Sequence, residues 1–271
     1  MVKTVCNFKL EDTVGALILG HSQTECGLDD SLIPNVKNLS QGGEAYFYTY
    51  QKAKKLLGEN RNIKILYISF SNNQLSAEMD RWTFDDIHID NAFPKYSAQI
   101  DSEDYRFLVS KNLKAVFKAE NRALWYNGKA LFTHRDIVNN DWGGYLRVEE
   151  AKVDSLRKGE SAKQRPIPQR MEISVVNIKY LQKIIELCDS KHVKPVLIRM
   201  PLYPDYFKSL DEITFQTVRK QHFQGVEFHD FHDYPLQVSD YRDYHHLNFK
   251  GAQKFSVYFN NYFRNHHKIH E

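Results

Sequence analysis

The stretch that decides the fold is Ala16-Leu17-Ile18-Leu19-Gly20-His21-Ser22, in which four apolar residues lead into a glycine and two polar residues. A continuous apolar run of this kind predicts a strand that is covered on both faces, as in a parallel sheet. In open parallel sheets, functional sites form outside the carboxyl ends of the strands. The position of His21 and Ser22 directly after the strand therefore makes them candidates for such a site.

Further segments have the composition of buried strands, and the spacing of apolar residues between them predicts helices. Strands are expected at residues 36–39, 63–70, 195–201 and 226–231. Helices are expected at residues 44–57, 174–191, 214–221 and 248–265, with Gly58 ending the first of them. This alternation predicts an α/β fold, a three-layer α/β/α domain with about five parallel strands joined by right-handed crossovers.

The alternation stops between residues 75 and 171, a polar and aromatic segment with no clear parallel strand. Patterns within it predict helices at residues 111–123 and 148–158, a tight turn at Asn127-Gly128 and a turn-like element at Trp142-Gly143-Gly144-Tyr145. We interpret residues 75–171 as an insertion packed over one edge of the sheet, within a single domain of residues 1–271. A lid, a partner surface and a helical segment without a special role are all open at this point.

The composition is that of one large globular domain. Of the 271 residues, 42% are hydrophobic, which is enough for a core and too many for a disordered chain. The net charge is only +3 and the basic residues form no dominant stripe, so nucleic-acid binding is not favoured. Cys6, Cys26 and Cys188 have the spacing of neither a disulfide framework nor a zinc motif, although one pair is free to bridge.

Ser22 is the candidate nucleophile, and residues near the C-terminus offer it a base. A serine hydroxyl attacks an ester only when an adjacent base takes its proton. Asp243 and His246 lie three positions apart, so the carboxylate can orient one nitrogen of the imidazole while the other faces the serine. His245 and Asp240 are the competing histidine and carboxylate. Taken alone, Ser22 is also a favoured residue for capping the helix that follows.

Attack on an ester creates an oxyanion, which hydrogen-bond donors must stabilise in a dry pocket. The candidate donors are the backbone amides of Ser22 and Gly43 and the side-chain amide of Asn72. Glycine suits this role because a side chain would obstruct the close approach of the substrate. Gly42 is an alternative to Gly43, and Asn73 is an alternative to Asn72.

In these residues the chain resembles the SGNH, or GDSL-like, hydrolases, a family with four sequence blocks. The corresponding segments are Gly20-His21-Ser22, Asn38-Leu39-Ser40-Gln41-Gly42-Gly43, Phe70-Ser71-Asn72-Asn73 and Asp243-Tyr244-His245-His246-Leu247-Asn248, with Gly251-Ala252 following. The resemblance implies Ser22 as nucleophile and Asp243 with His246 as the rest of a catalytic triad. It also implies Gly43 and Asn72 as oxyanion donors.

The first and third blocks depart from the family pattern. His21 stands where the family has an aspartate, and Phe70 and Asn73 replace a glycine and a second aspartate. These changes leave room for a degenerate site or for a shifted substrate. His21, Asn73, Arg199 and Tyr203 are candidate substrate contacts, although Arg199 also suits a surface charge or a charge that pairs with a helix.

The His-Leu-Asn-x-x-Gly-Ala run is similar to the membrane-associated branch of the family, which includes proteins of polysaccharide O-acetylation and of D-alanyl transfer to cell-wall polymers. This resemblance implies a serine esterase or acyltransferase that acts on O-acetyl esters of a cell-envelope glycan through an acyl-serine intermediate, without a cofactor. Its partners would be an acylated carbohydrate or small ester and a membrane acyltransferase. The alternative is a catalytically inactive SGNH-like module that binds a glycan or a membrane partner.

The sequence itself contains no apolar run near the roughly 20 residues of a membrane span. Residues 1–6 also lack the apolar stretch of a signal peptide. The resemblance nevertheless implies a cell-envelope protein, periplasmic or membrane-anchored, whose leader lies outside this sequence. A cytoplasmic protein is the alternative.

Two histidine-rich segments, residues 229–233 and 266–270, raise the question of a metal site. Strand alternation would separate the side chains of the first segment, and the second lies at the end of the chain. We therefore expect no metal.

Overall fold

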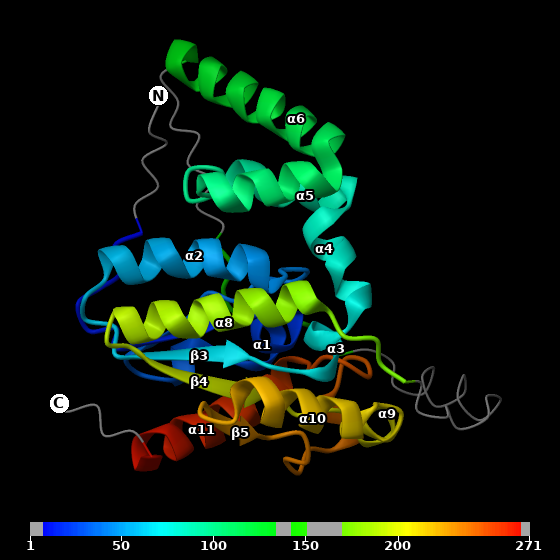
Figure 1. Cartoon of the computed structure of the whole chain (residues 1–271). Helices are drawn as coiled ribbons and strands as arrows, with labels where there is room; N and C mark the ends of the chain where they lie inside the picture. Colours follow the sequence, from blue (N-terminus) through cyan, green and yellow to red (C-terminus); the bar gives the residue numbers. More distant parts are fainter. Residues whose placement is uncertain (1–7, 134–141, 151–169, 267–271) are drawn as a thin grey trace.

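The computed structural model describes residues 8–133, 142–150 and 170–266, which contain an all-parallel sheet of five strands (Figure 1). The strands are β1 (Ala16–Leu19), β2 (Val36–Asn38), β3 (Ile65–Ser69), β4 (Lys194–Arg199) and β5 (Glu227–Asp230). Their order in the sheet is β2-β1-β3-β4-β5, and all four pairings are parallel. In this doubly wound order, the connections leave in opposite directions beside β1 and β3, where ligands commonly bind.

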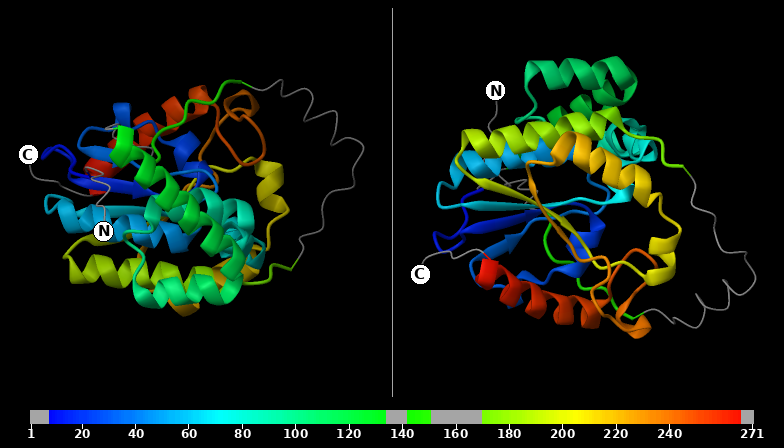
Figure 2. Two further views of the ribbon diagram at one scale, coloured as in Figure 1. Left: turned by 90° about the horizontal axis from the view of Figure 1, so that it is seen from above. Right: turned by 60° about the horizontal axis from the view of Figure 1, so that its bottom comes forward.

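Alternate residues of each strand supply two separate cores, one on each face of the sheet. Leu17 belongs to the core beneath α2, α8 and α10, whereas Ile18 belongs to the core formed with α11. The main helices are α1 (Ser22–Gly27), α2 (Tyr46–Glu59), α8 (Val175–Ser190), α10 (Glu212–Phe223) and α11 (Phe249–His266), and the short elements between them are η1 (Asp30–Leu32), α9 (Pro204–Lys208) and η3 (Val238–Asp240). Figure 2 shows helices on both sides of the sheet, so the predicted three-layer α/β/α fold is confirmed.

The chain between β3 and α8 forms a helical insertion that lies outside α2 and α8 (Figure 1). It contains α3 (Asn72–Leu75), η2 (Ala77–Asp80), α4 (Arg81–Phe84), α5 (Asp86–Tyr96) and α6 (Ser102–Thr133), the last kinked at Asn112. The buried carboxylate of Asp104 in α6 accepts hydrogen bonds from the Tyr180 hydroxyl at 2.8 Å and from the Gln51 amide at 2.7 Å. The helices of the insertion, up to residue 133, are thus fastened to α8 and α2 rather than to an edge of the sheet.

Three local predictions also differ from the structure. Gly58 lies inside α2 instead of ending it, because its position is open to solvent and a helical glycine there meets no obstacle. Asn127-Gly128 continues α6, since no strands flank the pair to make it a hairpin turn. Residues 148–150 are not helical, and the remainder of that expected helix lies outside the described residues.

Residues 142–150 form an extended segment that joins the loop after β2 to the start of α11. Gly143 has φ +90°, and a Cβ at this position would lie 2.2 Å from the Ser40 carbonyl oxygen. Only glycine therefore fits at this crossing. Farther along, the Phe249 N–H donates to the Val148 carbonyl at 2.8 Å. The segment expected to be turn-like at 142–145 thus acts as a strap between two of the sequence blocks.

Within the described part of the chain, none of the helices has both the length and the hydropathy that a membrane crossing needs. Cys26 and Cys188 are buried free thiols, and Cys6 lies outside the described residues.

Candidate active site

Ser22 is the first residue of α1, but it does not cap that helix. The cap is His21, whose Nδ1 accepts the Gln23 N–H at 3.1 Å. The alternative of a capping serine is therefore wrong, and the hydroxyl of Ser22 is left to face other groups. Gly20 allows the close approach of β1 and β3 at this point, because a Cβ there would lie 2.3 Å from the Cβ of Ser69.

The hydroxyl of Ser22 meets a histidine and a carboxylate from the other end of the chain. Its Oγ lies 2.8 Å from Nε2 of His246, and Nδ1 of the same ring lies 2.9 and 3.0 Å from the two oxygens of Asp243. Because a carboxylate only accepts hydrogen bonds, Nδ1 carries the ring proton and Nε2 accepts the hydroxyl hydrogen of Ser22. In this arrangement the base is placed to take the serine proton.

The loop around Asp243 keeps its side chain oriented and ionised. Burial acts to raise the pKa of Asp243, but hydrogen bonds from the His246 ring and from the backbone outweigh it, so the pKa lies below its usual value. Oδ1 accepts the N–H groups of His245 and His246 at 2.8 and 2.9 Å. The loop is closed by Asn248, whose side chain donates to the Ser239 carbonyl at 2.7 Å.

The two competing residues named from the sequence are occupied elsewhere. Both oxygens of Asp240 accept from Nζ of Lys254 at 2.8 Å. The ring of His245 packs against Tyr206, with centroids 4.1 Å apart, and burial lowers the pKa of His245. Asp243 and His246 are therefore the pair that meets Ser22.

His21 is buried and uncharged. Burial, followed by the nearby His246 and His245, lowers the pKa of His21 to about 3. Since its Nδ1 accepts from a backbone amide, the proton sits on Nε2, which lies 3.3 Å from the Ser71 hydroxyl. With 1% of its surface exposed, His21 links the end of β1 to the end of β3 and offers no charge to a substrate.

Gly42 and Gly43 form the candidate oxyanion segment beside Ser22. Gly43 has φ +72°, a conformation that favours glycine. A Cβ built on Gly42 would lie 3.7 Å from the Cβ of Ser22, whereas one built on Gly43 points toward Trp82 and His88. Among the described residues, neither glycine amide has a hydrogen-bond acceptor. Both amides are thus free to donate, and a side chain on Gly42 would reach toward Ser22.

Asn72 is the first residue of α3, and hydrogen bonds fix the orientation of its side chain. Its oxygen accepts from Nη1 of Arg199 at 3.3 Å, and its nitrogen donates to the Asp211 carbonyl at 3.4 Å. The second hydrogen of the Asn72 amide has no acceptor within the described residues. Asn72 also lines a cavity of about 340 Å³ together with Asn73 and Tyr206, and Tyr206 in turn contacts His245.

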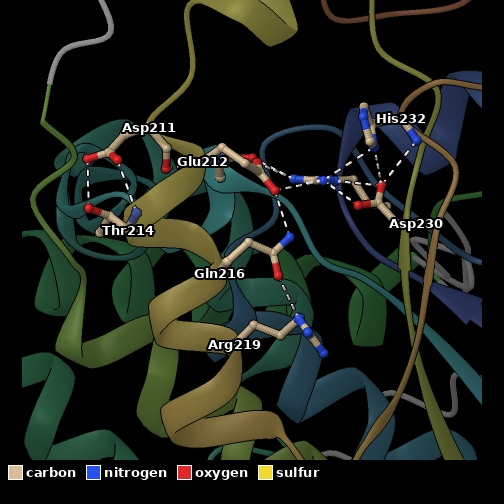
Figure 3. A network of polar contacts seen from close by, with 9 residues as sticks. Asp211, Glu212, Thr214, Gln216, Arg219, Asp230 and His232 are labelled. Atoms are coloured by element: carbon tan, nitrogen blue, oxygen red, sulfur yellow. Dashed lines mark hydrogen bonds and ion pairs between the residues drawn. The ribbon is translucent and has the colours of Figure 1, made fainter.

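Arg199 ends β4 at the centre of a buried ion-pair network, in which Glu212, Asp230 and His232 converge (Figure 3). Its guanidinium donates to the two oxygens of Glu212 at 2.7 and 3.1 Å and to Asp230 at 2.8 Å. The side chain of Arg199 is 0% exposed, so no face of the guanidinium is open to a substrate. The alternative of a surface charge is wrong, whereas that of a helix-pairing charge is confirmed, because Glu212 lies in α10.

Tyr203, the last candidate contact, is buried against two other rings. Its centroid lies 5.4 Å from that of Tyr241 and 5.3 Å from that of Tyr244. Tyr203 therefore supports the segment that leads into the triad loop.

The histidines of residues 229–233 have separate partners. Nε2 of His229 lies 2.6 Å from Glu227, whereas Nδ1 of His232 lies 2.8 Å from Asp230. Across residues 8–133, 142–150 and 170–266, no group of three ligand-type side chains is suited to a metal. Residues 267–270 lie outside the described part.

Sequence patterns missed two side chains beside Gly43, namely Trp82 of α4 and His88 of α5. They lie in the insertion, where the polar and aromatic composition has no period that separates site residues from packing residues. One signal was present, because Asp85 and His88 repeat the three-residue spacing of Asp243 and His246.

Comparison with known proteins adds little to this geometry. One family model, which carries no descriptive title, matches residues 147–268, less than half of the chain. The matched segment includes Asp243 and His246 but not Ser22. The search of curated proteins found no match.

Proposed function

We propose that the chain is an SGNH-like serine esterase or acyltransferase that forms an acyl-serine intermediate. The observation that carries this proposal is the 2.8 Å contact between the Ser22 hydroxyl and Nε2 of His246, with Asp243 behind the ring. The amides of Gly42 and Gly43, which have no acceptor among the described residues, also support it.

In the first half of the reaction, Nε2 of His246 takes the hydroxyl proton while Oγ of Ser22 attacks the ester carbonyl. The negative charge that forms on the carbonyl oxygen is stabilised by amide donors, with Gly42 and Gly43 nearest to the nucleophile. When the carbon–oxygen bond of the ester breaks, the imidazolium returns the proton to the leaving alcohol. The ionised carboxylate of Asp243 stabilises the imidazolium in between.

In the second half, His246 takes a proton from an incoming hydroxyl, which attacks the acyl group on Ser22. Breakage of the bond to Oγ restores the serine hydroxyl with the proton from His246. If the incoming hydroxyl belongs to water, the product is a carboxylic acid. If it belongs to a sugar, the acyl group is transferred, and the same side chains serve both outcomes.

The substrate class rests on resemblance rather than on contacts. The run from His246 to Ala252 is similar to proteins that act on acylated cell-envelope polymers. We propose an O-acetyl ester of such a glycan as the substrate, a membrane acyltransferase as the partner and the cell envelope as the location.

Labelling with a fluorophosphonate tests the nucleophile. Wild-type protein is expected to be labelled, and Ser22→Ala is expected to lose the label. Ser31→Ala, on the exposed element η1, is the matched control and should label normally. Absence of label on the wild type, together with retained binding of a glycan, would instead support a non-catalytic binding module.

A further inference from the structure

Two aromatic rings of the insertion form a wall beside the glycine segment. Trp82 and His88 stack with their planes 11° apart and their centroids 5.8 Å apart. A Cβ built on Gly43 would lie 3.9 Å from two ring carbons of Trp82 and 4.0 Å from Nε2 of His88. A Cβ built on Gly42 would instead lie 3.7 Å from the Cβ of Ser22, so neighbouring residues of one segment face the nucleophile and the stacked pair.

Asp85 sets the protonation and orientation of His88. Its Oδ1 caps α5 by accepting the His88 N–H at 3.1 Å and lies 2.6 Å from Nδ1 of the ring. Burial acts to raise the pKa of Asp85, but these hydrogen bonds hold it below its usual value. The proton is therefore on Nδ1, and Nε2 is an acceptor with no partner among the described residues.

Two hydrogen bonds hold the segment that carries Trp82 and His88 beside the glycine segment. The Tyr48 hydroxyl of α2 donates to the Thr83 carbonyl at 3.1 Å, next to Trp82. Nζ of Lys95 donates to the Gln41 side chain at 3.0 Å, which ties α5 to the residue before the glycine pair. Yet Trp82 is partly exposed, and the His88 side chain is 30% exposed. A fixed but accessible aromatic surface is thus built beside the nucleophile.

The chemistry of this surface selects among ligands. A flat ring pair offers dispersion contact to the C–H face of a pyranose, and the free Nε2 accepts a hydrogen bond from a sugar hydroxyl. The carboxylate of Asp85, 42% exposed, disfavours a phosphate or a second carboxylate at the same place. A purely apolar acyl tail would leave Nε2 of His88 without a donor.

We propose that Trp82 and His88 form a subsite for an uncharged sugar ring, with the indole stacked on the ring and Nε2 accepting one of its hydroxyl protons. This inference rests on the proposed function and extends it, because it assigns the sugar side of the substrate to the insertion. Trp82 and His88 act here in binding and take no part in the proton transfers of the triad.

The test compares an ester that carries a sugar with one that does not. Trp82→Ala is expected to raise KM for O-acetylated xylotetraose about tenfold, as loss of a stacked ring predicts, with kcat within about twofold of wild type. For p-nitrophenyl acetate, kcat/KM should stay within about twofold. Trp82→Phe keeps an aromatic ring, so its KM for the sugar ester should lie close to that of the wild type. Trp125→Ala is the matched control, because this side chain is 72% exposed on α6 and remote from the triad. It should leave KM and kcat unchanged for both esters.

Equal losses on both esters, or an unchanged KM for the sugar ester, would overturn the subsite. A binding measurement separates this failure from a failure of catalysis. Ser22→Ala protein is titrated with xylotetraose by isothermal titration calorimetry, and adding Trp82→Ala should weaken binding about tenfold. Absence of turnover of p-nitrophenyl acetate by the wild type would refute the proposed function alone. Absence of saturable xylotetraose binding, or binding that Trp82→Ala leaves intact, would refute the subsite.

Discussion

Replacing Asp243 by asparagine turns one oxygen behind His246 into an NH2 group, and the surrounding loop dictates which one. Oδ1 accepts the backbone N–H groups of His245 and His246 at 2.8 and 2.9 Å, so the amide oxygen of the variant must keep that position. The NH2 group then replaces Oδ2, 3.0 Å from Nδ1 of His246. The amide oxygen stays at the Oδ1 position, 2.9 Å from Nδ1, and can still accept its proton, but the NH2 group beside it repels that proton and favours the tautomer with the proton on Nε2, opposite the Ser22 hydroxyl.

Asp243→Asn is therefore expected to keep its fold and to weaken its base. Rings protonated on Nε2 cannot accept the proton of Ser22, and the carboxylate that stabilises the imidazolium is gone. The same exchange in a serine–histidine–aspartate triad costs about 10⁴-fold in kcat. The ring of His246 is 26% exposed and has some freedom to turn. We therefore expect a loss of about 10³- to 10⁴-fold in kcat, or about 4–5.5 kcal/mol in activation free energy.

The assay is hydrolysis of p-nitrophenyl acetate, measured below the thermal unfolding transition of each variant. Asp240→Asn is the matched control, because Asp240 serves Lys254 and the capping of η3 rather than the triad. This control should lower the unfolding temperature but keep kcat within about threefold. Retention of more than about a tenth of the wild-type kcat by Asp243→Asn would refute the assigned proton positions.

Three further predictions concern stability, each measured by urea unfolding. Arg199→Met removes a fully buried cation from the half-buried carboxylates of Glu212 and Asp230 and should lower the free energy of unfolding by about 2 kcal/mol. The exposed Lys208→Ala should lower it by less than about 1 kcal/mol, and equal losses would contradict the role of the Arg199 network. Gly43→Ala should lower the free energy of unfolding by about 1–2 kcal/mol, because alanine is strained at φ +72°. Gly58→Ala, inside α2, should raise the free energy of unfolding by up to about 1 kcal/mol. A higher free energy of unfolding for Gly43→Ala would refute the strain at this position. Because the pKa of His21 is about 3 in the fold, only the unfolded chain takes up its proton as the pH falls below 6.5. The free energy of unfolding should therefore be about 2 kcal/mol lower at pH 5 than at neutral pH because of this residue. His21→Asn should abolish this contribution. If the free energy of unfolding of the variant depends on pH as that of the wild type does, the buried neutral ring is contradicted.

The central strands β1 and β3 were predictable because they are covered on both faces, whereas all four residues of β5 are only half-buried. Burial on both sides demands an unbroken apolar run, so residues 16–19 and 65–69 stand out against their polar neighbours. Once the strands are placed, parallel order brings their carboxyl ends to one edge of the sheet. The approach of Ser22 to His246 follows from that geometry and from the spacing of Asp243, all of which are visible in the sequence.

What the sequence did not reveal depends on partners from distant elements. Nothing near Arg199 indicates that it is buried, because Glu212 and Asp230 come from α10 and β5. A polar stretch such as the insertion has no period to show that Trp82 and His88 face the glycine segment. The cap of α1 was also hidden: Ser22 was the capping alternative visible in the sequence, whereas the structure uses His21, and an imidazole is a rarer cap than a serine hydroxyl.

The central claim is that Ser22 carries the acyl group, and peptide mass spectrometry after rapid acid quenching tests it most directly. Wild-type protein mixed with p-nitrophenyl acetate should show an acetyl group on the peptide that contains Ser22. His246→Ala should form this adduct far more slowly, and Ser22→Ala should not form it at all. An acetyl group found only on other side chains, or an adduct on Ser22 that forms equally fast without His246, would contradict the account.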